Sequence, residues 1–241
     1  MHVTDGHLLG GRVRYAQPRT GYRSGIEPVL LAASVPARAG ERVLEAGSGA
    51  GATLLCLAAR VPGVRGVGFE CDPALVALAQ RNAADNGLDA LQFQHGHIEN
   101  LAVPRKAAFD HACANPPYHG EGTPSPIPAR EAAKRANAEA ISLWIAALSA
   151  ALRPGGTLTL ILSALQLPPC LTTMQQAGCG SGTLLPLWPR RGRGAKLVLL
   201  QMVKSGRGAF RILPGLVLHE DEHNYTPASE AILRGGSALV M

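Results

Sequence analysis

Four consecutive residues near the middle of the chain, Asn115-Pro116-Pro117-Tyr118, have the types and order needed to hold a planar amino group. Proline has no backbone N–H, so the apolar run before them cannot continue as a central strand. Each proline also keeps the preceding residue extended, which directs the polar atoms of Asn115 and Pro116 outward. The Asn115 side-chain oxygen and the Pro116 carbonyl can then each accept one N–H of an amine. Tyr118 adds a ring on which a base can stack.

A glycine-rich turn is the second candidate site. A strand-like run, RVLEAGS, leads into Gly47-Ser48-Gly49-Ala50-Gly51. Glycines allow a tight turn and close approach of a ligand, and the helix expected after the turn offers free N–H groups. The next strand-like run ends at Glu70, where a carboxylate can bind ribose hydroxyls. Taken alone, this pattern also fits a NAD-dependent oxidoreductase.

The charge of Glu45 separates these two alternatives. It lies two residues before the first glycine of the turn. A carboxylate at that point repels a pyrophosphate and attracts a cation. S-adenosylmethionine carries a sulfonium and an ammonium group, so the pattern favours this cofactor over a dinucleotide. A strand-end acid paired with a nearby arginine is the structural alternative for Glu45.

The elements that must position these residues follow a β-α alternation. The expected strands are residues 42–48, 64–70, 90–96, 109–117, 157–164, 182–189 and 196–203, and the expected helices are residues 51–61, 73–87, 138–156 and 168–178. This order predicts an α/β, Rossmann-like fold with a mostly parallel seven-stranded sheet and helices on both faces. We expect residues 196–203 to form an antiparallel edge strand. Gly155-Gly156 are expected to end the third helix, and the proline-rich residues 119–136 to form a mobile flap.

One domain is expected from the length of 241 residues. We divide it into an N-terminal segment (1–40), a Rossmann-like core (41–206) and a C-terminal appendage (207–241). The appendage contains a capped helix start at residues 226–230. No apolar run reaches the roughly 18 residues that span a bilayer, and no export signal is recognisable. The five cysteines form no CxxC pair, so we expect reduced thiols in a soluble, cytoplasmic protein.

The charge distribution points to a polyanionic partner. The chain has a formal net charge of +6, and acidic residues are absent from Ala140 through His219. Basic residues of that interval cluster in Arg190, Arg191, Arg193 and Lys196, next to an aromatic residue. Such a cluster can contact the phosphates of a nucleic acid. A solvated basic surface without a partner is the alternative.

Several stretches together resemble the bacterial tRNA1(Val) adenine-N6 methyltransferases, which belong to the class I methyltransferases with an NPPY motif. They are Glu45-Ala46-Gly47-Ser48-Gly49, GYRSGIEPVLLAA, NPPYHGEGTPSP, LLPLWPRRGRGAKLVLLQMVKSG, LPGLVLHE and YTPASEAILRGGSAL. The resemblance covers nearly the whole chain. It implies S-adenosyl-L-methionine as the cofactor and a tRNA adenine as the substrate.

The resemblance also assigns roles to residues. The cofactor-binding residues that it implies are Glu45, Gly47, Gly49, Glu70 and Asn115, with Tyr22, Arg23, Ser24 and Gly25 closing over the methionine end. Asn115, Pro116, Pro117 and Tyr118 would hold the target amine, and His119, Arg19, Arg190, Arg191, Arg193 and Lys196 would contact the nucleic acid. This chain has Gly96-His97-Ile98 where many relatives have Asp to meet the cofactor adenine. His97 or Glu99 can accept that bond, with Ile98 alongside.

The sequence therefore predicts transfer of a methyl group to an exocyclic amine, namely N6 of the adenine 3′ of the anticodon in valine tRNA. A release-factor glutamine amide and guanine N2 of rRNA remain alternative substrates, and a non-catalytic cofactor- and RNA-binding module is the alternative of another class. His219-Glu220-Asp221-Glu222-His223 matches the HExxH zinc expression, but the residues around it lack helical spacing of apolar positions. We expect an exposed acidic turn there, no metal and no membrane contact. The oligomeric state is not indicated.

Overall fold

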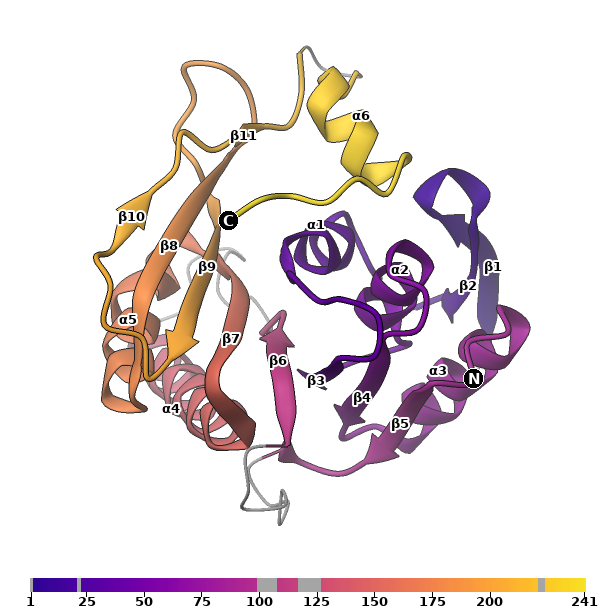
Figure 1. The fold of residues 1–241 in the computed structure, drawn as a ribbon, viewed down its shortest axis with the longest axis horizontal. Helices are drawn as coiled ribbons and strands as arrows, with labels where there is room; N and C mark the ends of the chain where they lie inside the picture. The colour runs from indigo at the N-terminus through magenta and orange to yellow at the C-terminus, as the bar shows by residue number, and fades with distance from the viewer. Residues whose placement is uncertain (1, 21–22, 99–107, 117–126, 221–223) are drawn as a thin grey trace.

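The main β-sheet runs through the molecule and carries helices on both faces (Figure 1). The computed structural model describes residues 2–20, 23–98, 108–116, 127–220 and 224–241, with only the backbone for residues 127–138. Five of the main strands are parallel neighbours, in the order β7-β6-β3-β4-β5. They are β3 (Arg42–Ala46), β4 (Arg65–Glu70), β5 (Leu91–His95), β6 (Phe109–Ala114) and β7 (Leu152–Ser163).

The sheet continues beyond β7 with antiparallel strands. β9 (Leu197–Lys204) is antiparallel to both β7 and β8 (Cys179–Trp188). The two-residue strands β10 (Arg211–Ile212) and β11 (Leu216–Val217) pair with the outer side of β8. The prediction that residues 196–203 are antiparallel is confirmed, but their predicted place at the edge is wrong. β9 lies between two strands, and its side chains are buried on both faces of the sheet, which explains its nearly continuous apolar sequence.

Side chains alternate between two hydrophobic clusters, one on each face. On β7, Ile161 faces the first cluster, and Leu160 and Leu162 face the second. The first cluster lies under α1 (Glu27–Ser34), α2 (Ala52–Arg60) and α3 (Pro73–Asp85), and the second under α4 (Ile127–Ala151) and α5 (Leu167–Gln176). Figure 1 shows these two groups of helices on opposite sides of the strands. The predicted helices on both faces are confirmed.

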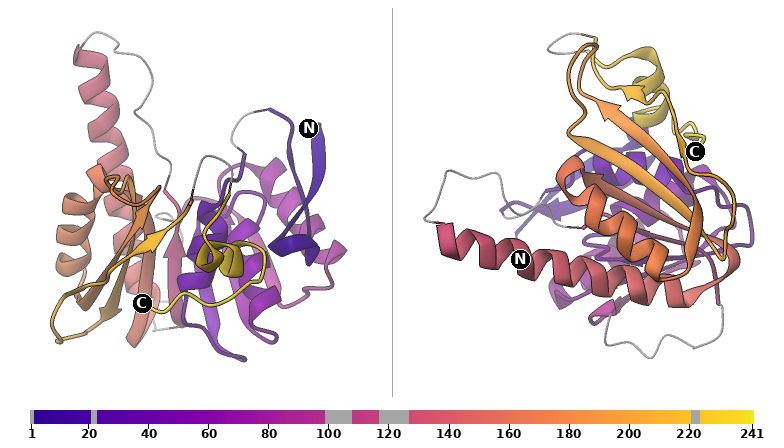
Figure 2. Two further views of the ribbon diagram at one scale, coloured as in Figure 1. Left: turned by 90° about the horizontal axis from the view of Figure 1, so that it is seen from above. Right: turned by 90° about the vertical axis from the view of Figure 1, so that its left-hand side faces the viewer.

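Helix α4 corrects two expectations. It begins at Ile127, so residues 127–136 form helix instead of a flap, and residues 117–126 lie outside the described part. The helix starts near the carboxyl edge of the sheet, and Figure 2 shows its first half extending beyond the strands. It ends at Ala151, before Gly155. Gly155 instead has φ +81° within a β-bulge, where the pairing of β6 with β7 shifts between Phe109 and His111.

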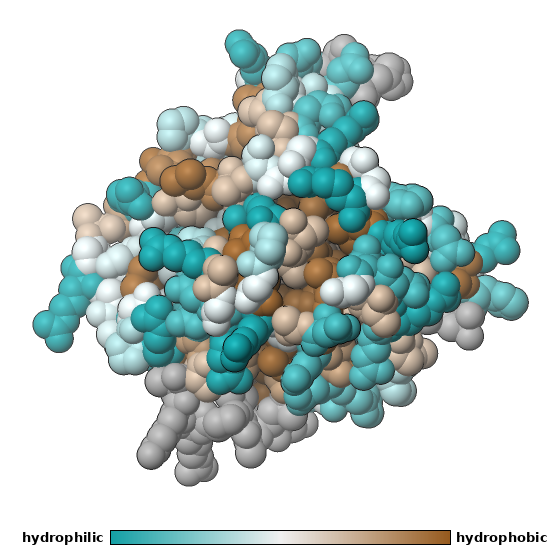
Figure 3. Space-filling model, turned by 45° about the vertical axis from the view of Figure 1, so that its right-hand side comes forward, coloured by the Kyte–Doolittle hydropathy of each residue, from teal (hydrophilic) through white to brown (hydrophobic). Residues whose placement is uncertain are grey.

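The two ends of the chain pack against the core. Strands β1 (Val3–Leu8) and β2 (Val13–Pro18) form an antiparallel hairpin around the 3-10 turn Leu9–Gly11. Elsewhere in the chain, a second 3-10 turn, Ala164–Gln166, precedes α5. On the side of the molecule that carries the hairpin, hydrophilic side chains surround a more apolar centre (Figure 3).

The C-terminal appendage packs against α1. Thr226 caps α6 (Pro227–Leu233) by accepting a hydrogen bond from the Ser229 amide, as predicted. The Leu239 amide donates to the Ala33 carbonyl at 2.8 Å. None of the described helices is long and apolar enough to cross a membrane.

Candidate active site at the carboxyl edge of the sheet

The glycine turn links β3 to α2 through left-handed backbone. Gly47, Gly49 and Gly51 have φ values of +66°, +54° and +90°. A residue with a β-carbon is strained in this region, so the turn needs these glycines. A β-carbon on Gly47 would also lie 2.6 Å from the Trp144 ring of α4, whereas one on Gly49 would meet no atom within 4 Å. The backbone at Gly49 therefore leaves open space where a ligand can approach.

Glu45 is a buried carboxylate at the mouth of this turn. It is 1 % exposed, and its Oε2 atom has no hydrogen-bond partner among the described residues. Burial raises the pKa of Glu45 to about 8, the Thr53 hydroxyl lowers it by a hydrogen bond, and the charge of Glu70 raises it. Since no arginine pairs with it in the described part of the chain, the structural alternative for Glu45 is not supported. An acceptor without a partner that faces a cavity suits a cationic ligand.

Glu70 ends β4, and its carboxylate fixes the backbone of the glycine turn by a hydrogen bond. Its Oε2 accepts from the Gly49 amide at 2.9 Å, and its Oε1 accepts from the Asp72 amide at 3.0 Å. It is 8 % exposed and is not among the residues that line the cavity described below. The residue that does line the cavity there is Asp72, the N-cap of α3. The predicted contact between Glu70 and the cofactor stays a prediction.

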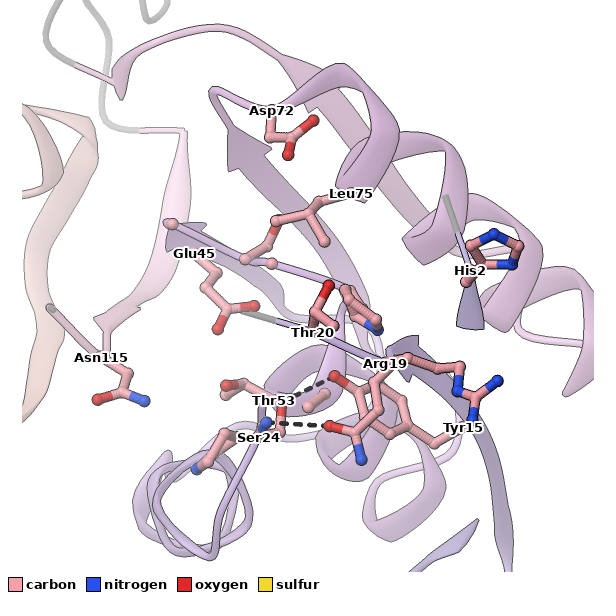
Figure 4. Close-up of a pocket in the computed structure, with 18 residues that line it drawn as sticks. His2, Tyr15, Arg19, Thr20, Ser24, Glu45, Thr53, Asp72, Leu75 and Asn115 are labelled. Atoms are coloured by element: carbon pink, nitrogen blue, oxygen red, sulfur yellow. Dashed lines mark hydrogen bonds between the residues drawn. The ribbon is translucent and has the colours of Figure 1, made fainter. Parts of the chain in front are cut away.

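Asn115 follows directly after β6, beside the turn. Glu45 pairs with Cys113 in the β3–β6 ladder, and alternate residues of a strand share a face. Asn115 therefore emerges on the same face as Glu45, and Figure 4 shows both side chains beside one space. Pro116 is buried. Pro117, Tyr118 and His119 lie outside the described residues, so the predicted stacking ring stays a prediction.

Glu45, the turn and Asn115 line one cavity of about 860 Å³. Its lining comes from the N-terminal segment, β3, the glycine turn, α2, the start of α3 and the end of β6. The residues are His2, Tyr15, Gln17, Pro18, Arg19, Thr20, Ser24, Pro28, Glu45, Gly47, Ser48, Gly49, Ala50, Ala52, Thr53, Asp72, Leu75 and Asn115. A cavity of this size at the carboxyl ends of parallel strands is the usual ligand site of an open α/β sheet.

The N-terminal segment forms one wall of the cavity. The Tyr15 hydroxyl and the Ser24 Oγ lie 2.8 Å apart, and the Ser24 amide donates to the Gln17 side chain (Figure 4). Ser24 lines the cavity, whereas Arg23 and Gly25 do not, and the predicted closure of this segment over the cofactor stays a prediction. Tyr22 lies outside the described residues.

The expected adenine-binding residues are less clearly placed. His97 is exposed just after β5, Ile98 is 3 % exposed in the core, and Glu99 lies outside the described residues. Neither His97 nor Ile98 lines the cavity. Leu75, which does, offers an apolar surface there. Its signal in the sequence was weak, because an apolar residue in a first helical turn is usually part of the core.

The acid-free basic interval divides between two edges of the sheet. Ser163 at the carboxyl end of β7 pairs with Leu197, so Arg190, Arg191, Arg193 and Lys196 lie in the loop at the same edge as Asn115. Thr157 at the amino end of β7 pairs with Val203, which places Arg207 near the opposite edge. The acid-free interval therefore does not give the molecule a single basic end, because β9 runs across the whole sheet.

The residues that match the HExxH expression do not begin on a helix. His219 forms an isolated antiparallel bridge with Tyr225, and their rings stack with centroids 4.7 Å apart. Residues 221–223 lie outside the described part. Among the residues that the structure describes, no three His, Cys, Asp or Glu side chains gather so that they could hold a metal ion.

Comparison with known proteins defines the class first. A methyltransferase domain model matches residues 43–156. The crystal structure of a predicted O-methyltransferase from Agrobacterium tumefaciens has the same fold, with a TM-score of 0.75 over 89 % of this chain and 99 % of that chain at 22 % identity. The chain has the fold of the class I methyltransferases, and its cofactor is S-adenosylmethionine.

The relatives in sequence are more specific. The tRNA1(Val) (adenine(37)-N6)-methyltransferase of Actinobacillus succinogenes is 28 % identical over 210 residues, which are 86 % of this chain and 87 % of that protein. The resemblance inferred from the sequence is thereby confirmed. The release factor glutamine methyltransferase of Geobacter sulfurreducens is 40 % identical, but over 76 residues that cover 32 % of this chain and 26 % of that protein.

Proposed function

We propose that this enzyme transfers a methyl group from S-adenosylmethionine to N6 of the adenine 3′ of the anticodon in valine tRNA. The observation that carries the proposal is the shared cavity of Glu45 and Asn115, on neighbouring strands at the carboxyl edge. One residue is suited to a cationic cofactor and the other to an amine. The full-length relatives act on this adenine, as their names state.

The cofactor fits the residues of the cavity. The Glu45 Oε2 atom supplies an acceptor for the ammonium group, and the open space beside Gly49 accepts a ligand close to the backbone. Ser24 and Tyr15 close the wall formed by the N-terminal segment. When bound, the cofactor supplies an electrophilic methyl group.

The chain's own residues then orient the amine. The Asn115 side-chain oxygen and the Pro116 carbonyl accept its two N–H groups, which draws the nitrogen lone pair out of conjugation with the base. Placement in line with the methyl group provides most of the rate enhancement. No strong general base is required, because the amine can release its proton to water after transfer.

The basic loop supports a nucleic acid as the substrate. Arg191, Arg193 and Lys196 are exposed at the edge that carries Asn115. They can contact phosphates while a loop base turns into the cavity. Such a substrate places the enzyme in the cytoplasm. A glutamine amide has no use for these cations, and the two release factor glutamine methyltransferases among the relatives match 32 % and 57 % of this chain, less than the 86 % matched by the tRNA methyltransferase.

Nucleoside analysis tests the proposal directly. Transcripts of valine tRNA are incubated with enzyme and labelled cofactor, digested, and analysed by mass spectrometry. We expect N6-methyladenosine with the natural transcript, and none when the adenine 3′ of the anticodon is replaced by guanine. Methylated guanosine, or an unmodified tRNA alongside a methylated release factor, would contradict the assignment.

A further inference from the structure

One buried side-chain amide on α3 joins two walls of the cavity. Asn82 is 1 % exposed. Its Oδ1 accepts from the Ala16 amide at 2.9 Å, and its Nδ2 donates to the Ala16 carbonyl at 2.9 Å and to the Ala50 carbonyl at 3.0 Å. Both donor protons and the acceptor of the amide are therefore in use.

The two backbone partners belong to different parts of the site. Ala16 lies in β2, which continues into the cavity-lining residues Gln17 and Arg19. Ala50 belongs to the glycine turn and lines the cavity itself. Asn82 thus fixes the distance between the N-terminal wall and the turn without touching the cavity, since it is not one of the lining residues.

A second amide one helical turn later provides a natural comparison. The Asn86 Oδ1 accepts from the Arg14 amide at 2.9 Å, and its Nδ2 donates to the Arg14 carbonyl at 2.8 Å. Residues four apart share one side of a helix, so both amides pair with alternate residues of β2. Asn86 makes the same two bonds to the hairpin, but its third bond goes to the Asn82 carbonyl at 2.7 Å and not to the turn.

We propose that Asn82 is a positioning residue that sets the width of the cofactor cavity by tying Ala16 of the hairpin to Ala50 of the glycine turn. Without it, the Ala50 carbonyl loses its donor, and a buried acceptor without a partner favours rearrangement toward water. The turn and the N-terminal wall then move independently. This inference rests on the proposed place of the cofactor in this cavity.

The test compares Asn82→Ala with Asn86→Ala in the full-length enzyme. Each variant loses the same pair of bonds to β2, but only Asn82→Ala loses the bond to the turn. We expect Asn82→Ala to raise the Kd and the KM for S-adenosylmethionine about 10-fold, the effect of one buried hydrogen bond of ~1.4 kcal/mol. In Asn86→Ala we expect less than about a 2-fold change. The KM for tRNA, and kcat at saturating cofactor, should stay near wild type in both.

A merely structural role gives a different pattern. It would lower the melting temperature of both variants and leave the KM for the cofactor within about 2-fold of wild type, which would overturn the proposal. Equal rises in KM for the two variants would overturn it as well. If Asn82→Ala does not fold, Asn82→Asp replaces it, because it keeps the shape and the acceptor for the Ala16 amide but loses the donations to the Ala16 and Ala50 carbonyls. The same rise in the KM for the cofactor relative to Asn86→Ala is expected. A wild-type enzyme that binds no S-adenosylmethionine would contradict the proposed function instead.

Discussion

The strands β3 and β6 carry acidic side chains near both ends, but these acids are paired at the amino end and buried without a full set of partners at the carboxyl end. At the amino end, His111 lies between Thr157 and Glu41, with its ring nitrogens 2.8 and 2.9 Å from their side-chain oxygens. Arg153 pairs with Asp110, which also accepts from the Arg42 amide. At the carboxyl end, Glu45 is buried with one oxygen unpartnered among the described residues.

The pKa values of the acids reflect this difference. Burial raises the pKa values of Glu41 and Asp110, but hydrogen bonds from His111, Arg153 and backbone amides outweigh it and lower both pKa values. Burial dominates at Glu45, whose pKa rises to about 8. At the amino end the acids are therefore paired with basic groups of the protein. At the carboxyl end a cationic ligand would supply the partner that Glu45 lacks among the described residues. The same strands support structure at one end and function at the other.

The largest effect is expected for Asn115→Ala at the carboxyl end. It removes the acceptor proposed to orient the amine, so we expect kcat to fall about 100-fold or more. Cofactor affinity measured by calorimetry should stay within a few-fold of wild type. A variant with unchanged kcat would remove Asn115 from the mechanism, and the carboxyl end would lose its functional distinction.

Glu45→Gln should weaken cofactor binding about 100-fold, because it removes the buried carboxylate proposed to meet the ammonium group. The raised pKa gives this prediction a second readout. At pH 6.5 the free protein holds Glu45 protonated, and a bound ammonium favours the carboxylate, so binding should release close to one proton and should tighten as the pH rises toward 8. Calorimetry in buffers with different ionisation enthalpies measures that proton.

Two controls sharpen the result for Glu45. 5′-Methylthioadenosine lacks the amino-acid part of the cofactor, so its binding should release no proton. The Gln variant should release none with either ligand. Proton release that persists in Glu45→Gln would assign the titration to another group.

The basic loop should contribute a smaller effect, confined to the nucleic acid. Arg191→Ala combined with Arg193→Ala should weaken tRNA binding about 10-fold and reduce the dependence on salt concentration by one to two units of log–log slope. The matched control is Arg65→Ala with Arg207→Ala, two exposed cations at the amino end. Equal losses from both pairs would show that tRNA does not distinguish the two edges.

The smallest effect is expected for Glu41→Gln, which removes a carboxyl group whose pKa is lowered in the folded protein. A carboxyl group with a folded-state pKa below its unfolded value stabilises the protein above that unfolded value, and this contribution is lost as the pH falls through the folded-state pKa. The variant should lose about 1 kcal/mol of unfolding free energy at pH 7 and show a weaker decline below pH 5. Cofactor affinity should not change. Denaturant titrations at several pH values measure the free energy of unfolding.

Much of the fold could be predicted because local signals agreed with the tertiary structure. The β-α alternation specified the parallel strands, and the helix starts expected at Pro73 and at residues 226–230 lie where the structure has them. The hairpin β1–β2 was missed, since its partner on α3 is a pair of side-chain amides, which leave no periodic pattern. The position of β9 was missed because antiparallel pairing on both sides looks the same in sequence as pairing on one.

The sequence by itself determined the chemistry that this protein can perform. Proline fixes the end of β6, glycine permits the turn, and the residue types of Glu45 and Asn115 define what each can bind, because these properties belong to the residues and their immediate neighbours. Only the tertiary structure decided that Glu45 and Asn115 share a cavity, that the acid-free interval divides between two edges, and that Asn82 joins two walls of the site. Those facts depend on strand register and helix packing, which arise from burial of the whole core.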